Sequence, residues 1–188
     1  MKLLLASNSP RRRELITGLD YPVEIVKLKE IDETHPAYLS AGDIPLHIAR
    51  LKMQAYDIDL APGQVLVTAD TIVWVDGQEL GKPRDAADAH RMLRLLSGRT
   101  HQVYTAVCLR SALDQQEFVC QTDVTFAELA DEQIDYYIRE YRPFDKAGAY
   151  GIQEWIGYVG CTRLEGSYFN VMGLPVQKLY TQLQKLKV

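Results

Sequence analysis

Three consecutive arginines lie where a helix is predicted to begin. Ser and Pro at positions 9 and 10 are typical of a helix cap and first position, so Arg11, Arg12 and Arg13 fall in the first turn. The helix dipole disfavours cations there, whereas a bound anion would reverse this cost, because free backbone N–H groups and guanidinium groups both bind phosphate. We therefore predict a polyphosphate site over residues 7–13 that includes Ser7. Arginines pointing into solvent, at about 0.3–1 kcal/mol each, are an equally compatible alternative.

An aspartate lies inside the apolar run of residues 65–75. Because Asp70 comes directly after an apolar strand, we expect its carboxylate at the C-terminal edge of a sheet, where ligands of open α/β folds bind. A carboxylate in this position is suited to hold Mg²⁺ or to orient a water molecule. The alternative is an aspartate that caps a turn or pairs with an arginine, the commoner role of an isolated aspartate at a strand end.

Four further residues carry groups that suit a nucleotide. Glu33 offers a second carboxylate, and Lys52 and Lys82 can neutralise phosphate as point charges, although each of the three is singly typical of a solvated surface. The amide of Gln153 can donate to the O4 carbonyl of uracil or thymine and accept from the N3 hydrogen. A structural glutamine is equally compatible with the sequence. The loop before it has glycines at positions 148 and 151, which let backbone approach a ligand.

Elsewhere the chain alternates between the hydrophobic periods of strands and helices. Strands are predicted at residues 2–6, 23–28, 65–75, 102–110 and 117–126, with a short strand near Tyr158. Helices are predicted at about residues 10–18, 44–56, 85–96, 131–141 and 176–186. Asp76 and Gly77 predict a hairpin turn, and a loop is expected over residues 143–153. Without a repeat or a linker in this pattern, we expect one mixed α/β domain over residues 1–188.

Length, charge and cysteine content narrow the classes of function. The 188 residues include 21 basic and 25 acidic side chains, and a net charge of -4 favours a small ligand over a long nucleic acid. Three cysteines without C-x-x-C spacing indicate reduced thiols rather than a disulfide framework or a zinc site. The first apolar run stops after Ala6 and no later run is long enough to cross a membrane, so we expect a cytoplasmic protein.

Six segments in order along the chain resemble the Maf family of nucleotide pyrophosphatases. They are LASNSPRR at residues 5–12, ADTIV at 69–73, GKP at 81–83, LSG at 96–98, DKAGAYGIQ at 145–153 and VMGLP at 171–175. The resemblance implies an elongated α/β fold with a mixed sheet flanked by helices, similar to inosine triphosphatase, with two lobes around a central cleft. It also implies that the triphosphate meets a divalent metal in the cleft, and that the protein is often a homodimer.

The resemblance also implies roles for single residues. Asp70 matches the family's proposed general base. Arg11, Thr71 and Gln153 match the branch that acts on dTTP and UTP, whereas the 7-methyl-GTP branch carries a tryptophan after the proline and a glutamate in place of the glutamine. Residues 34–43 do not obviously follow the family, which leaves loop geometry and fine selectivity open.

The resulting hypothesis is metal-dependent hydrolysis of dTTP or UTP to the monophosphate and pyrophosphate. Asp70 and Glu33 would hold Mg²⁺ or Mn²⁺, and a water near Asp70 would attack the α-phosphorus. The leaving pyrophosphate would be stabilised by the metal and four cations: Arg11, Arg12, Lys52 and Lys82. The alternatives are a pyrophosphatase for purine or modified bases such as 7-methyl-GTP, a nucleotide-sensing regulator of septum formation, and a nucleic-acid-binding module.

Overall fold

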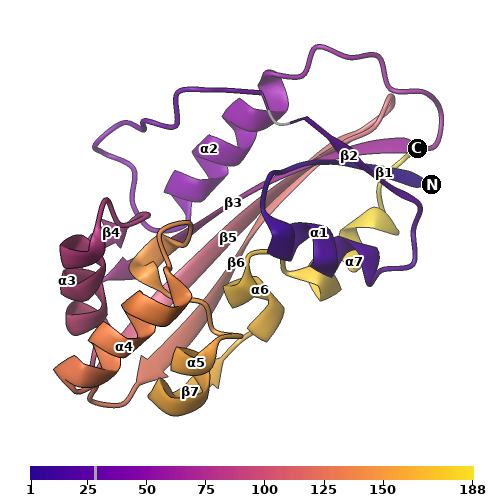
Figure 1. Ribbon diagram of the computed structural model, residues 1–188. Helices are drawn as coiled ribbons and strands as arrows, with labels where there is room; N and C mark the ends of the chain where they lie inside the picture. The colour runs from indigo at the N-terminus through magenta and orange to yellow at the C-terminus, as the bar shows by residue number, and fades with distance from the viewer. Residues whose placement is uncertain (28) are drawn as a thin grey trace.

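The computed structural model describes residues 1–27 and 29–188. Within these residues a seven-stranded sheet runs through the molecule and helices cover both of its faces (Figure 1). The strand order is β2-β1-β3-β5-β6-β7, and β4 pairs with β3 beside this path. The strands are β1 (Lys2–Ala6), β2 (Val23–Val26), β3 (Gln64–Val75), β4 (Gln78–Leu80), β5 (Thr100–Arg110), β6 (Gln115–Phe126) and β7 (Cys161–Glu165).

The sheet changes from parallel to antiparallel at β3, which pairs in parallel with β1 on one side and antiparallel with β5 on the other. β1 pairs in parallel with β2 and with the first residues of β3, where Leu5 lies opposite Val67. β1 ends at Ala6, whereas β3 continues to Val75 and pairs along this length with antiparallel β5. The second half of β3 therefore extends beyond the end of β1, and the side of the strand that β1 covered becomes open to other elements.

Alternation along the strands divides the core between two faces. Leu66 and Cys108 pack with Met53 of α2 on one face, whereas Val65 and Val67 belong to the larger cluster on the other face. In Figure 1, α2 lies on one side of the long strands and α1, α6 and α7 lie on the other. The helices are α1 (Pro10–Thr17), α2 (Asp43–Gln54), α3 (Ala86–Leu96), α4 (Asp131–Tyr141), α5 (Trp155–Gly160), α6 (Tyr168–Met172), α7 (Val176–Leu183) and the 3₁₀ helix η1 (Ala147–Ala149).

Most of the predicted elements are confirmed, with ends that differ by a few residues. Ser9 caps α1 as predicted, Asp85 caps α3, and the predicted turn at Asp76 and Gly77 has positive φ angles of 49° and 77°. The strand predicted over residues 23–28 is β2, and its last predicted residue, Leu28, lies outside the described residues. In the described part of the chain, no helix is long and apolar enough to cross a membrane.

The short strand predicted near Tyr158 is wrong. Tyr158 lies in α5, and the strand β7 begins only at Cys161. The β-branched and aromatic residues of this segment favour a strand, but Ile156 and Gly160, four residues apart, are both buried, so helical burial overrides the strand propensity. The loop predicted over residues 143–153 contains η1, and α6 was not predicted because its five residues are too few for a clear helical period.

Candidate functional site

A cleft of about 430 Å³ opens where β3 extends past the end of β1. Its walls come from the loop before α1 and the start of α1, from α2 and β3, from the loop after β4, from the segments on either side of η1, and from the end of α6. All nine residues predicted to form the site line it, although they span most of the chain. They are Ser7, Arg11, Arg12, Glu33, Lys52, Asp70, Thr71, Lys82 and Gln153.

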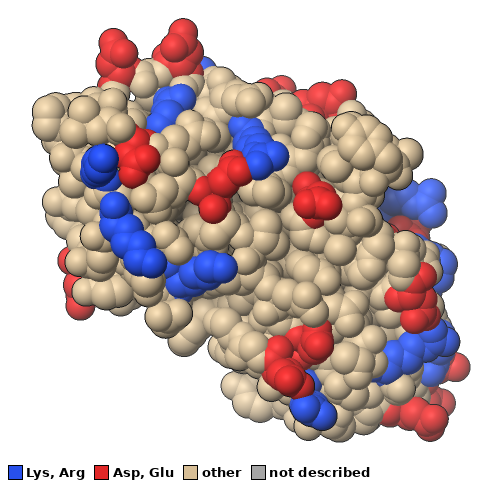
Figure 2. Space-filling model, turned by 180° about the vertical axis from the view of Figure 1, so that it is seen from behind, with Lys and Arg blue, Asp and Glu red and all other residues tan. Residues whose placement is uncertain are grey.

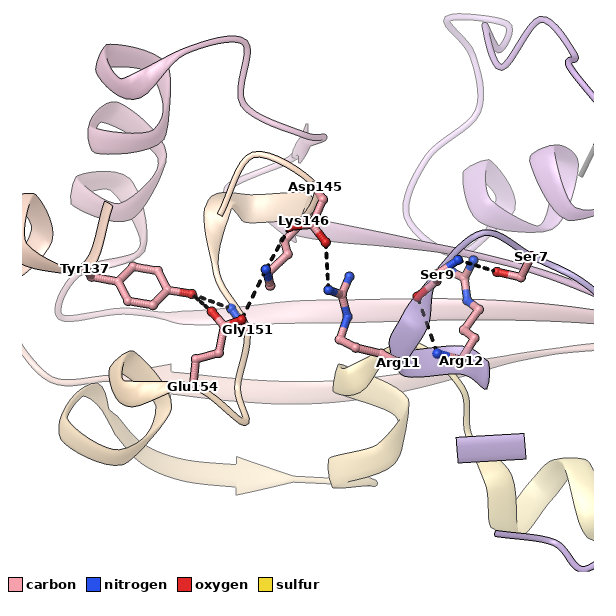
Figure 3. Close-up of polar contacts among 9 residues, drawn as sticks. All are labelled: Ser7, Ser9, Arg11, Arg12, Tyr137, Asp145, Lys146, Gly151 and Glu154. Carbon is pink, nitrogen blue, oxygen red and sulfur yellow. Dashed lines mark hydrogen bonds and ion pairs between the residues drawn. The ribbon is translucent and has the colours of Figure 1, made fainter. Parts of the chain in front are cut away.

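The loop before α1 is held by its own polar groups (Figure 3). The Ser9 hydroxyl caps the helix by accepting from the backbone N–H of Arg12 at 3.4 Å. The Ser7 hydroxyl accepts from the backbone N–H of Ser9 at 3.2 Å, and the Arg13 Nε donates to the Ser7 carbonyl at 3.2 Å. Ser7 itself is only 3% exposed. The sequence therefore builds a rigid helix start at one end of the cleft.

The arginines of α1 do not point freely into solvent. Arg12 donates to the Gly173 carbonyl through Nε and to the Thr71 hydroxyl through a terminal nitrogen, each at 2.8 Å. Arg11 pairs with Asp145 across the cleft at 3.0 Å. Burial lowers the pKa of Arg12 from its ordinary value, although a guanidinium remains protonated in proteins. Of the two alternatives for these side chains, the structure favours guanidinium groups that line a cleft.

Asp70 lies in the middle of β3, not at the end of its own strand as we predicted. The C-terminal edge beside Asp70 is the end of the neighbouring strand β1, because β3 extends past it. Successive strand residues point to opposite faces, so Asp70 meets Lys52 of α2 whereas Thr71 meets Arg12 of α1. The open side of β3 thus brings both faces of the sheet into one cleft.

Lys52 holds two carboxylates together. Its Nζ lies 2.7 Å from Asp70 Oδ1 and 3.0 Å from Glu33 Oε1. The Lys52 side chain is 7% exposed and that of Asp70 13%, whereas Glu33 is about half exposed at 48%. Among the described residues, His, Cys, Asp and Glu do not gather in groups of three or more that could hold a metal ion. Two carboxylates suit Mg²⁺ when phosphates and water supply its other ligands.

Gln153 and Lys82 lie at other parts of the cleft wall. The Gln153 side-chain oxygen is buried and has no hydrogen-bond partner within the described residues. A buried acceptor without a partner costs about 1–3 kcal/mol, so a ligand N–H that reached it would relieve that cost. Lys82 is exposed and lies beside Gly81, whose carbonyl accepts from the Gly148 N–H at 3.0 Å.

Two polar residues at the cleft, Lys146 and Thr105, had not been assigned from the sequence. Lys146 lines the cleft although it is only 8% exposed, and it pairs with Asp145 at 2.8 Å and with Glu154 at 3.1 Å. Thr105, opposite Thr71 on β5, is fully buried and lies 2.9 Å from the Thr71 hydroxyl. Thr105 depends on contacts with segments distant in sequence, whereas Lys146 contacts nearby residues and lies in the motif at residues 145–153, which was its one sequence signal.

The molecular surface carries charges of both signs. On the face shown in Figure 2, lysines and arginines are scattered among carboxylates and wide uncharged areas. Inside the cleft, five cations from α1, α2 and the loops lie among four carboxylates. This arrangement favours a compact anion over a long polyanion, which would need an extended basic surface. Fold and cleft together define an α/β protein suited to bind a small polyphosphate.

The chain belongs to the Maf family, because the family model described as Maf-like protein matches residues 2–186. It is 58% identical over 185 residues to a dTTP/UTP pyrophosphatase of Phocaeicola vulgatus, covering 98% of this chain and 96% of that protein. A dTTP/UTP pyrophosphatase of Bacteroides fragilis is 54% identical with the same coverage. The solved structure of a HAM1 protein from Coxiella burnetii has a TM-score of 0.51 and 15% identity, covering 98% of this chain and 99% of that one, which shows a shared fold.

Proposed function

We propose that this protein is a nucleoside triphosphate pyrophosphatase that hydrolyses dTTP and UTP to the monophosphate and pyrophosphate. The observation that carries the proposal is the meeting of Asp70, its cations and Gln153 in one cleft. The proposal is supported by family membership and by relatives that are named dTTP/UTP pyrophosphatase at 50% to 58% identity. A single domain over residues 1–188, a cytoplasmic location and assembly into a homodimer are further expectations of the same proposal.

The triphosphate would occupy the end of the cleft near α1. Arg11 and Arg12 offer guanidinium groups there, and the exposed Lys82 offers a point charge at the rim. The pyrimidine would lie at the Gln153 end, where the amide can donate to O4 and accept from N3–H. Cytosine presents the opposite pattern at these two positions, so a fixed amide would favour uracil and thymine.

The metal in this proposal is Mg²⁺ or Mn²⁺, held by Asp70 and Glu33. Both carboxylates already turn toward one cationic centre, the Lys52 ammonium, at 2.7 and 3.0 Å. Hard divalent cations bind one or two such carboxylates and keep other positions for phosphate and water. When bound, the metal would neutralise negative charge on the phosphates.

In the proposed reaction a water molecule attacks the α-phosphorus. Asp70 takes a proton from this water as the new P–O bond forms and the bond to the bridging oxygen of the β-phosphate breaks. Pyrophosphate leaves with the electron pair of that bond, and Arg11, Arg12 and Lys82 stabilise its charge. Such catalysis needs mainly positioning and electrostatic stabilisation rather than a covalent intermediate.

A substrate panel tests this function. Purified protein with Mg²⁺ or Mn²⁺ is given dTTP, UTP, CTP, GTP, ITP and 7-methyl-GTP, and pyrophosphate release is measured. Turnover of dTTP and UTP is expected to be much faster than that of the other four nucleotides, and with ¹⁸O-labelled water the label should enter the monophosphate. Hydrolysis of 7-methyl-GTP alone would contradict the assignment of Arg11, Thr71 and Gln153. Tight nucleotide binding without turnover would favour the regulatory alternative instead.

A further inference from the structure

A chain of polar contacts begins behind the cleft at α4 and continues along the cleft wall to α1 (Figure 3). The Tyr137 hydroxyl donates to the Glu154 carboxylate, and the other oxygen of Glu154 pairs with Lys146 at 3.1 Å. Lys146 pairs with Asp145 at 2.8 Å, and Asp145 pairs with Arg11 at 3.0 Å. Tyr137 and Glu154 are not among the residues that line the cleft. They therefore lie one layer behind the residues that would touch a nucleotide.

The direction of each hydrogen bond at Tyr137 is fixed by its partners. The backbone N–H of Gly151 donates to the Tyr137 oxygen at 3.0 Å, so the phenol proton is free to bind Glu154. Burial, together with the hydrogen bond and charge of Glu154, raises the pKa of Tyr137 above its ordinary value, which keeps this proton in place. Tyr137 is fully buried, and it joins the backbone at Gly151 to the carboxylate of Glu154.

The Glu154 carboxylate also lies near the amide of Gln153. A Cβ placed on Gly151 would lie 2.9 Å from Gln153 Nε2, 2.9 Å from the Glu154 carboxyl carbon and 3.1 Å from its Oε2. The amide nitrogen and the carboxylate therefore pack around the same point. A carboxylate attracts an amide NH₂ and repels an amide oxygen, so the charge on Glu154 favours one of the two amide orientations.

That orientation decides which pyrimidine Gln153 can bind. Uracil and thymine need a donor facing O4 and an acceptor facing N3–H, whereas cytosine needs the reverse. Turning the amide by half a turn exchanges the two patterns. A residue that holds the amide in one orientation is therefore a determinant of selectivity without touching the base.

We propose that Tyr137 and Glu154 are positioning residues that select uracil and thymine over cytosine by fixing the orientation of the Gln153 amide. This inference rests on the proposed function. Tyr137 fixes Glu154 and the Gly151 backbone from one side, and Lys146 supplies the counter-charge for Glu154 from the other. The same Lys146 links the base end of the cleft to Arg11 at the phosphate end through Asp145.

The test compares kcat/KM for UTP and CTP in Tyr137→Phe and Glu154→Gln, with Tyr136→Phe as the matched control. Tyr136 is the neighbouring tyrosine on α4 and is 38% exposed, so its variant loses the same hydroxyl outside this network. The UTP over CTP preference should fall about tenfold in both network variants, because one buried charge-assisted hydrogen bond is lost. It should stay unchanged in the control.

Two further measurements separate selectivity from general damage. Inhibition by inorganic tripolyphosphate reports the phosphate end of the cleft, and it should be unchanged in all three variants. Gly151→Ala places a methyl group against Gln153 and Glu154 and should also lower the UTP over CTP preference. An unchanged preference in the network variants, or a loss of tripolyphosphate inhibition equal to the loss for UTP, would overturn the inference. Absence of UTP turnover in the unmodified protein would instead refute the proposed function itself.

Discussion

Replacing Thr105 by valine tests how the cleft holds Arg12. Thr105 is fully buried, and its hydroxyl donates to the Asn170 carbonyl at 3.0 Å. Its single proton is used there, so the Thr71 hydroxyl must donate to Thr105 at 2.9 Å and accept from Arg12 at 2.8 Å. Valine has nearly the same shape but neither donor nor acceptor. The substitution therefore breaks this chain of hydrogen bonds at its buried end.

The expected cost follows from these contacts. Thr105→Val leaves the Asn170 carbonyl without this donor and the Thr71 hydroxyl without this acceptor, which should lower the free energy of unfolding by about 2 kcal/mol. For a chain of this size that corresponds to a fall in Tm of roughly 4–8 °C. With Thr71 free to rotate, Arg12 loses a fixed partner, and KM for UTP should rise about fivefold, the equivalent of one weakened hydrogen bond.

Thermal unfolding and steady-state UTP hydrolysis measure both effects. Thr100→Val is the matched control, because Thr100 lies on the same strand and its hydroxyl meets Thr125 at an exposed position. It should change the free energy of unfolding by no more than about 0.5 kcal/mol. Thr105→Ser restores the hydroxyl and should recover most of the UTP affinity. If Thr105→Val behaves like Thr100→Val in both assays, the reasoning about this hydrogen-bond chain is refuted.

Three further outcomes are expected. Burial lowers the pKa of His101 from 6.5 to about 3, so below pH 6.5 the imidazole is protonated in the unfolded chain but stays neutral in the folded protein. The free energy of unfolding should therefore fall by about 2 kcal/mol between pH 7 and 5. His101→Gln should flatten this dependence in Tm measurements across pH. Gly148 has a φ of 67°, and a Cβ placed there would lie 2.8 Å from Val73 Cγ2, so Gly148→Ala should lower the free energy of unfolding by about 2 kcal/mol. Gly81→Ala is the control and should not lower it, because the space around its Cβ is open. EDTA should abolish UTP hydrolysis and leave Tm unchanged, with activity restored by Mg²⁺ or Mn²⁺; hydrolysis that persists in EDTA would contradict the metal dependence.

Sequence patterns predicted the elements of the fold well where burial follows a regular period. α3 is an example, because its capped start and the helical spacing of its apolar residues agree with their packing in the core. The strand predicted near Tyr158 was wrong because this segment has strand-forming residue types but is buried with a helical spacing. Asp70 was misplaced along its strand because the edge of the cleft is set by where β1 ends, which a single strand's sequence does not reveal.

Some residues of the candidate site could likewise be predicted from the sequence, and others could not. Arg12 and Asp70 stood out because each is unusual in its local setting, a cation at a helix start and a carboxylate inside an apolar strand. Thr105 and Tyr137 gave no comparable signal, since a threonine in a strand and a tyrosine on a helix are ordinary core residues. Their importance comes from partners distant in sequence, at Asn170 and Glu154, which only the fold brings close.

The central claim is that Asp70 drives hydrolysis of pyrimidine nucleoside triphosphates in this cleft. Asp70→Asn keeps the size of the side chain and an oxygen that can accept from Lys52, but it removes the basic carboxylate. The matched control is Asp76→Asn, in an exposed turn whose positive φ asparagine tolerates. With UTP and Mg²⁺, the account predicts that Asp70→Asn retains nucleotide binding while its rate of pyrophosphate release falls at least about a hundredfold, and that Asp76→Asn keeps the unmodified rate. A near-normal rate in Asp70→Asn would contradict the account.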